Sequence, residues 1–221
     1  MKLAQATTKF PAFESDSPPA RSVARTAERT MEELRRENAR LRRTVAELET
    51  YRALAYRDAL TGLWNRRYFE ERLGQEISLA RRAPTGRFSL LLLDLNDLKR
   101  INDHEGHGAG DLAIQRAANF LRSRLREHDV CCRIGGDEFV VILRDLGPSE
   151  SAQLCARLRN ELVNANAGRE TPISLSMGVA SFPDDSTSAA DLLLRADEAM
   201  YADKRRQKNI VTTAVALASE V

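Results

Sequence analysis

The sequence predicts an α/β (α+β) fold in which helices cover a mainly antiparallel sheet and a long helix precedes this sheet. Three observations support the prediction. Two apolar runs flank a glycine turn within residues 130–143, a third apolar run occupies 88–93, and segments with helical periodicity lie between the runs. The expected order in the domain is helix, strand, helix, helix, strand, hairpin, strand, helix, strand, helix and a closing strand.

The N-terminal part of the chain divides into two segments of different composition. Residues 1–21 contain several Pro, Ser, Thr and Asp residues with little to bury, which indicates a flexible tail where an unknown regulatory partner would bind. Residues 22–57 are rich in Glu, Arg, Leu and Ala and show a heptad repeat, which predicts a coiled-coil dimerisation helix. Its two core positions are occupied by Ala27, Leu34, Leu41, Leu48 and Ala55, and by Met31, Asn38, Val45 and Arg52.

The residues at these core positions favour a parallel two-stranded coiled coil. Leucine recurs at one position, and the single asparagine at the other, Asn38, would pair with its own copy and penalise other registers. The alternative is an amphipathic helix packed on its own domain, but a stripe of two positions flanked by charges is narrow for that role. We therefore expect a homodimer.

The domain is expected to begin near Asp58 and to span residues 58–212, followed by a C-terminal tail at 213–221. Gly62 breaks the first helix, and Asn65 can cap a second helix. The helices of the domain are expected at 66–82, after Asp94, and at 110–127, 148–165 and 188–204, with a further strand at 173–179.

Acidic residues follow two of the predicted strands. Asp137 and Glu138 lie in the glycine turn, where we expect Gly135 and Gly136 to adopt positive φ angles and to let another molecule approach the backbone. Asp94 ends the preceding apolar run, so it emerges at the carboxyl end of a buried strand. Neighbouring carboxylates repel unless a cation neutralises them, and oxygen ligands of this kind suit Mg²⁺ bound to substrate phosphates. The pattern predicts a divalent-metal site for a nucleotide.

Composition argues against several other classes of protein. The formal net charge of +2 gives no general electrostatic support for binding a nucleic acid polymer or an anionic membrane. No apolar run reaches membrane length and the N-terminus lacks the apolar core of a signal peptide, so we expect no membrane association and a cytoplasmic location. Cys131, Cys132 and Cys155 fit no metal-binding spacing and are expected to be reduced, buried thiols.

Residues 135–139 spell Gly-Gly-Asp-Glu-Phe, the GGDEF signature of diguanylate cyclases, and the chain resembles that family in three further segments. These are 58–67, the strand-to-helix segment 94–111, and 196–209, which is similar to the family pattern A-D-x-A-[LM]-Y-x-A-K-x-x-G-R-N. The resemblance implies a polymerase-palm or nucleotide-cyclase-like sheet flanked by helices. It also implies that a dimer condenses two GTP into cyclic di-GMP and two pyrophosphates, with Mg²⁺ (or Mn²⁺) as cofactor.

The resemblance further implies roles for individual residues. The metal ligands would be Asp94, the Leu95 carbonyl, Asp137 and Glu138, with Asp137 also accepting a proton from the attacking hydroxyl. Lys99 would stabilise phosphate charge, and the substrate would be bound by Asn102 and Asp111 at the guanine edge, by His107, Gly135 and Gly136, and by Lys204 and Lys208 at the phosphates. An RxxD sequence, Arg126 and Asp129, would form an inhibitory site for the product, joined by Arg157.

The sequence departs from the family pattern at several positions. Asn96 stands where many members have aspartate, and Leu98 where many have phenylalanine. Gln207 replaces glycine, and Lys208 replaces arginine, so a point charge would replace a planar fork at the phosphate. No implied metal ligand is missing, and we expect an active enzyme. The alternatives are a catalytically quiet effector that binds cyclic di-GMP at the RxxD sequence, and a dimeric scaffold.

Overall fold

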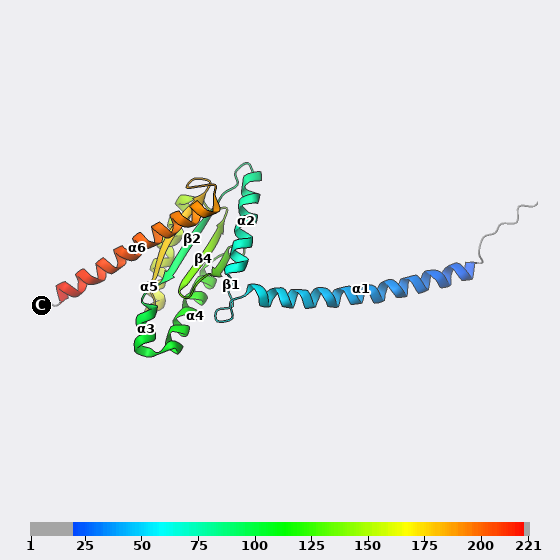
Figure 1. Cartoon of the computed structure of the whole chain (residues 1–221), viewed down its shortest axis with the longest axis horizontal. Coiled ribbons are helices and arrows are strands. Elements are labelled where there is room, and N and C mark those ends of the chain that lie inside the picture. Colours follow the sequence, from blue (N-terminus) through cyan, green and yellow to red (C-terminus); the bar gives the residue numbers. More distant parts are fainter. Residues whose placement is uncertain (1–19, 219–221) are drawn as a thin grey trace, which may run out of the picture. The chain divides into compact units, whose positions relative to one another are not determined.

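The computed structural model describes residues 20–218. The chain divides into two units, an N-terminal helix up to Arg52 and a domain from Ala53 onward. Helix α1 (Ala20–Tyr56) begins two residues before the predicted start of the coiled-coil segment and ends one residue before its predicted end (Figure 1). The rest of the expected N-terminal tail, 1–19, lies outside the described residues.

The domain is built on a five-stranded sheet with the order β1-β3-β4-β2-β5. Its strands are β1 (Trp64–Asn65), β2 (Phe88–Leu95), β3 (Val130–Arg133), β4 (Glu138–Arg144) and β5 (Leu175–Phe182). The short strand β1 pairs parallel with β3, and all the other neighbours pair antiparallel. The mainly antiparallel sheet predicted from the sequence is therefore confirmed.

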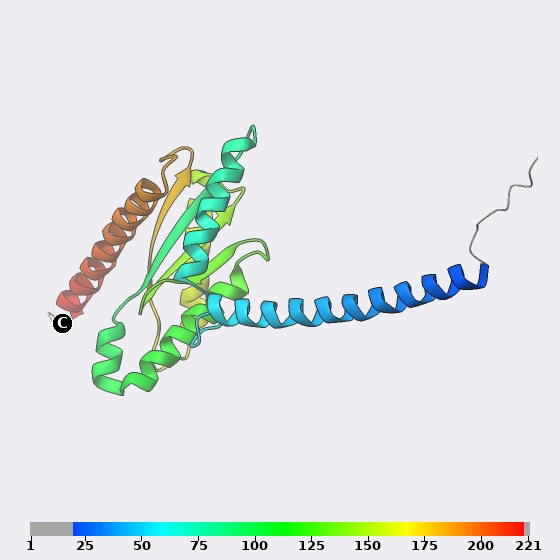
Figure 2. The same cartoon turned by 45° about the vertical axis from the view of Figure 1, so that its right-hand side comes forward.

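Helices cover both faces of the sheet (Figures 1 and 2). On one face lie α3 (Leu98–Glu105), α4 (His107–Arg124) and α5 (Pro148–Asn166). On the other face lie α2 (Arg66–Arg82) and α6 (Ala189–Ala218). The predicted cap of α2 is confirmed, because the Asn65 side chain accepts a hydrogen bond from the Tyr68 amide.

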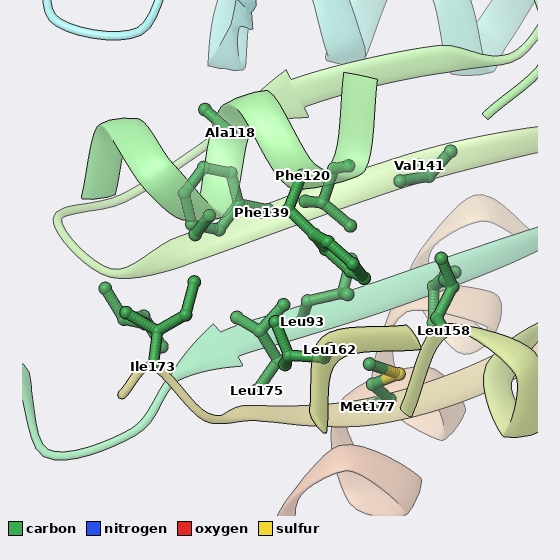
Figure 3. Packing of buried hydrophobic residues seen from close by; sticks show 14 of the residues in the cluster. Leu93, Ala118, Phe120, Phe139, Val141, Leu158, Leu162, Ile173, Leu175 and Met177 are labelled. Carbon is green, nitrogen blue, oxygen red and sulfur yellow. The ribbon is translucent and has the colours of Figure 1, made fainter. Parts of the chain in front are cut away.

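The central strand β2 is buried along its whole length because both of its faces meet helices. Its side chains alternate between two apolar clusters, with Leu91 and Leu93 on the α4 and α5 side and Leu90 and Leu92 on the α2 and α6 side. Figure 3 shows the first cluster, in which strand side chains such as Leu93 meet those of the covering helices. Each fully buried leucine contributes about 1.5–3 kcal/mol.

The cysteines behave as small apolar residues. Cys131 is partly buried and packs against the first cluster, whereas Cys132 is buried in the second, so these neighbours point to opposite faces. Cys155 is also buried, and burial raises the pKa of its thiol to about 11. It therefore stays protonated and unreactive at neutral pH.

Helix α6 packs unusually close to the sheet and extends further than predicted. A Cβ atom at Gly178 of β5 would lie 2.1 Å from the Ala196 carbonyl oxygen, so only glycine permits this approach. The prediction of a closing strand is wrong, because within residues 20–218 the chain after β5 forms this helix and no strand. The helix runs through most of the expected C-terminal tail. No helix in the described part of the chain has both the length and the apolar character needed to cross a bilayer.

Candidate active site

The Gly-Gly-Asp-Glu turn lies beside the end of β2. The Ile134 amide donates a hydrogen bond to the Glu138 carbonyl at 2.9 Å, which closes the hairpin between β3 and β4. The Leu95 amide donates to the Asp137 carbonyl at 2.9 Å, and Asp94 pairs with Glu138 across β2 and β4. Strand pairing thus brings the four predicted metal-binding residues to one edge of the sheet, which we call the acidic edge (Asp94, Leu95, Asp137 and Glu138).

The donor atoms at the acidic edge are of the type that a hard divalent cation prefers, carboxylate and carbonyl oxygens. Asp94 is only 8% exposed, and its Oδ1 lies 2.6 Å from Lys204 Nζ, so this carboxylate already neutralises a positive charge. Among the described residues, no three His, Cys, Asp or Glu side chains converge as a complete metal cage. The residues therefore fit a divalent cation in chemical type, and the side chains of Asp137 and Glu138 would have to turn toward Asp94 to hold one.

The predicted conformation of the two turn glycines is wrong. Neither Gly135 nor Gly136 has a positive φ angle, because backbone hydrogen bonds close the turn without one. A Cβ atom at Gly135 would lie 2.4 Å from Glu138 Oε2, so this glycine makes room for the Glu138 side chain. At Gly136 no other described part of the chain lies within 4 Å of the Cβ position, which leaves the backbone open to a ligand.

Arg133, at the end of β3, binds the turn and the start of the domain simultaneously. Its guanidinium donates to the carbonyls of Gly135 at 3.1 Å and Gly136 at 2.8 Å. It also donates to both carboxylate oxygens of Asp58 at 3.2 Å, and Thr61 donates two further hydrogen bonds to Asp58. Burial alone would raise the pKa of Asp58, but the hydrogen bonds from Thr61 and Arg133 outweigh it and lower the pKa. Sequence reasoning gave Arg133 no role, although it stands two residues before the glycines.

The predicted guanine-binding residues lie near the point where α3 joins α4. The Asn102 side chain lies against the α4 backbone, since a Cβ atom at Gly110 would fall 1.9 Å from its Oδ1. Asp111 follows on α4 and is exposed, as are Lys99 and His107. These three side chains are accessible to a ligand, but within the described structure Lys99 and His107 make no hydrogen bond to the acidic edge.

The two predicted phosphate-binding lysines lie one turn apart on α6. Lys204 is joined to the acidic edge through Asp94, and Lys208 is exposed on the next turn. The residue before Lys204, Asp203, is buried and was given no role by the sequence reasoning. The feature of the sequence that could have drawn attention to Asp203 is its departure from the family pattern, which has alanine at that position.

The three predicted inhibitory residues line one pocket of about 400 Å³. The Arg126 amide donates to Asp129 Oδ2 at 2.9 Å, and Arg157 on α5 donates to the Arg124 carbonyl at 3.3 Å. Asp129 Oδ1 is buried and accepts no hydrogen bond within the described residues. A buried carboxylate oxygen without a donor is costly, so this pocket favours a ligand that supplies one.

A larger pocket of about 900 Å³ lies between α3, α5 and α6 and contains none of the predicted substrate-binding residues. Its basic side chains are balanced by acidic ones. The basic side chains are Arg100, His104, Arg159 and Arg206, and the acidic ones are Asp97, Glu105, Glu170 and Asp203. Pocket size alone therefore does not identify an active site, and the candidate site is the acidic edge, where the carboxylates are concentrated.

A sheet edge that carries three carboxylates beside a lysine of a covering helix is typical of domains that bind phosphorylated ligands together with a divalent cation. The sequence matches the family model described as "Diguanylate cyclase, GGDEF domain" over residues 55–210, well over half of the chain. The chain belongs to the GGDEF family, which confirms the resemblance.

Relatives of known name share the domain but are longer proteins. The diguanylate cyclase DgcP of Pseudomonas aeruginosa is 39% identical over 163 residues, which are 72% of this chain and 24% of DgcP. The response regulator PleD of Caulobacter vibrioides is 38% identical over 165 residues, which are 72% of this chain and 36% of PleD. The chain spans between 23% and 46% of the length of the first curated relatives it matches.

A solved structure supports the fold over a larger part of the chain. The coiled coil and GGDEF domain of DgcB from Caulobacter crescentus, in complex with c-di-GMP, aligns with a TM-score of 0.68 at 29% identity. The alignment covers 80% of this chain and 94% of that chain. The expected fold, a sheet flanked by helices and preceded by a long helix, is therefore confirmed.

Proposed function

We propose that this chain is a diguanylate cyclase that condenses two GTP molecules into cyclic di-GMP and releases two pyrophosphates. One observation carries the proposal: Asp94 pairs with Glu138 across two central strands, directly beside Asp137 in the open turn. The names of the relatives support the choice of substrate, because proteins up to 39% identical are described as diguanylate cyclases.

The residues divide the work of binding and reaction. Asn102 and Asp111 would bind the guanine edge, since a carboxylate can accept hydrogen bonds from guanine donors that adenine lacks. Lys99, Lys204 and Lys208 would balance the charge of the phosphates. The open backbone at Gly136 would let the phosphates approach the turn. Asp137 would accept the proton of the attacking 3'-hydroxyl. Mg²⁺ or Mn²⁺, held by the acidic edge, would stabilise charge at the phosphates during the reaction.

We infer that the enzyme acts as a dimer, because the product is two-fold symmetric and one domain carries a single set of these residues. The apolar heptad residues of α1 support pairing of that helix: Leu34, Leu41 and Leu48 are 60%, 53% and 61% exposed in the single chain. Such a stripe is stabilised when a second copy covers it. A parallel coiled coil would raise the effective concentration of one domain near the other.

We also propose that cyclic di-GMP inhibits the enzyme at the pocket lined by Arg126, Asp129 and Arg157. Guanidinium groups suit phosphodiester oxygens and the Hoogsteen edge of guanine, and the buried Asp129 Oδ1 would accept a hydrogen bond from a guanine N–H. Solved GGDEF domains in complex with c-di-GMP support this ligand. A cytoplasmic location and a regulatory partner for the N-terminal tail stay predictions.

The proposed activity is tested by incubating the purified chain with GTP and Mg²⁺ and separating the nucleotides. Cyclic di-GMP should form, and Asp137→Ala should lower its formation by about a thousandfold or more, because this change removes a proposed metal ligand and proton acceptor. Glu198→Ala, an exposed change on α6 at a position that the family pattern leaves free, is the control. Binding of cyclic di-GMP without turnover would indicate the effector instead, and neither activity would indicate the scaffold.

A further inference from the structure

Asp203 is a buried carboxylate on α6 that has no role in the proposed reaction. It is 3% exposed, and the family pattern has alanine at its position. Its Oδ2 accepts hydrogen bonds from the Met177 amide of β5 and from Gln207 Nε2, both at 2.9 Å. Its Oδ1 lies 2.8 Å from a guanidinium nitrogen of Arg159. A buried carboxylate without such partners would be strongly destabilising, so these contacts are specific.

Gln207, which replaces the family's glycine, continues this network to the ends of β2 and β5. Its Nε2 also donates to the Leu175 carbonyl at 3.1 Å, and its Oε1 accepts from Asn96 Nδ2 and Ser174 Oγ, both at 3.0 Å. Asn96 Oδ1 in turn accepts from Ser176 Oγ at 2.8 Å. We call this cluster the polar clamp (Asn96, Ser174, Ser176, Asp203 and Gln207). Three of its members, Asn96, Asp203 and Gln207, are departures from the family pattern, and they form one connected chain of contacts.

The polar clamp is adjacent to the acidic edge. Asn96 follows Asp94 by two residues at the end of β2. Lys204, whose ammonium contacts Asp94, directly follows Asp203 on α6. The clamp therefore fixes the helix backbone on both sides of Lys204, at Asp203 before it and at Gln207 one turn after it.

We propose that Asp203 is a positioning residue that acts through Gln207 and Asn96 to hold α6 in register on β2 and β5, so that Lys204 is aimed at the phosphates of GTP. This role rests on the proposed cyclase function. Lysine is a point charge on a flexible side chain, so its accuracy depends on the backbone that carries it. A misplacement of about 1 Å, caused by a change outside the reacting groups, can cost about a hundredfold in rate.

Two substitutions separate positioning from charge. Asp203→Ala removes both acceptors, whereas Asp203→Asn keeps an oxygen that can accept from Met177 and Gln207. We expect Asp203→Ala to raise the KM for GTP about tenfold while kcat changes less, and Asp203→Asn to stay within about threefold of the wild type. A merely structural role would lower the active fraction, and so the apparent kcat, with an unchanged KM. Arg205→Ala, an exposed change on the same turn, is the control.

Hydrogen exchange of the α6 backbone amides tests the clamp without turnover. Exchange at residues 200–207 should be faster in Asp203→Ala and close to wild type in Asp203→Asn. If the wild-type chain makes no cyclic di-GMP, the proposed function fails, while the exchange data still decide whether Asp203 fixes α6. An unchanged KM and unchanged exchange in Asp203→Ala would overturn the positioning role, and so would an Asn variant as impaired as the Ala variant.

Discussion

At the scale of single residues, Arg133 connects the beginning of the domain to the turn that carries the acidic pair. A planar guanidinium can bind a carboxylate and two carbonyls at once because its donors point in several fixed directions. Its side chain is only 14% exposed, so these contacts are weakly screened by water. The turn is consequently held by this side chain together with backbone hydrogen bonds, and not by a positive φ angle at glycine.

Arg133→Lys should reduce both stability and turnover. Lysine keeps the charge but cannot reach Asp58 and both glycine carbonyls together, and each charge-assisted hydrogen bond contributes about 1.5–3 kcal/mol. We expect kcat/KM to fall about tenfold or more and the free energy of unfolding to fall by about 2 kcal/mol. Steady-state kinetics and urea unfolding measure the two effects. Arg195→Lys, at an exposed site, is the control, and wild-type values for both quantities in Arg133→Lys would contradict the assigned role.

Asp58 should make stability dependent on acid. Because its folded-state pKa lies below the ordinary value of 3.8, the ionised carboxylate stabilises the fold above that pH. The stabilisation is lost as the pH falls from 3.8 through the lowered folded-state pKa. The unfolding free energy of the wild type should therefore fall more steeply in this window than that of Asp58→Asn, with Asp197→Asn as the control. If the unfolding free energies of the wild type and Asp58→Asn change with pH in parallel, the Asp58 carboxylate does not cause this pH dependence.

At the scale of elements, the single helix α1 has little to stabilise it within its own chain. All its described side chains from Glu28 to Arg52 are exposed in the single chain, and its stability in water depends on local ion pairs such as Arg29 with Glu33 until its apolar stripe is covered. A partner helix is the covering that the heptad repeat favours.

Replacing Leu34 and Leu41 together by serine should dissociate the dimer. The change removes two apolar core positions without altering charge, and sedimentation equilibrium should show a monomer. Turnover should fall in proportion to the loss of dimer, and raising the protein concentration should restore part of it. Arg43→Ser, outside the core positions, should have neither effect. A variant that stays dimeric would place the dimer contact elsewhere.

At the scale of the whole molecule, the predicted inhibitory pocket and the acidic edge are separate sites in one domain. Arg126 and Asp129 lie in the segment that leads into β3, and β3 leads into the turn. A ligand in the pocket would therefore bind at the start of the strand that ends in Arg133, which would connect the proposed product binding to the turn.

Arg126→Ala should relieve inhibition by cyclic di-GMP. Loss of a guanidinium contact to an anionic ligand costs about 1.5–3 kcal/mol, so the inhibition constant should rise about tenfold to a hundredfold while turnover at low product is unchanged. Initial rates measured over a series of added cyclic di-GMP concentrations test this. Glu127→Gln, the exposed neighbour, should be inhibited like the wild type. Equal inhibition of all three proteins would exclude the pocket as the inhibitory site.

Local sequence was sufficient for the long elements and for the acidic residues. The apolar run of β2, the Asn65 cap of α2 and the Gly-Gly-Asp-Glu turn each follow from neighbouring residues, because periodicity, capping and turn formation are local effects. The prediction of a closing strand, which also relied on local sequence, is wrong. Residues 205–218 are compatible with helix, and nothing in their immediate sequence ends α6.

Tertiary structure alone decided which distant side chains meet. The sequence could not predict that Lys204 would contact Asp94, that Arg133 would bind Asp58, or that Glu138 would need the space of Gly135. These contacts join residues from different elements, and they exist because strand register and helix packing place those elements against each other. The sequence by itself thus determined the family, most of the elements and the acidic residues that are proposed as metal ligands. The packing of α6 and the pairing of β2 with β4 decided the geometry of the site, since distances between elements are set by the whole core and not by any single segment.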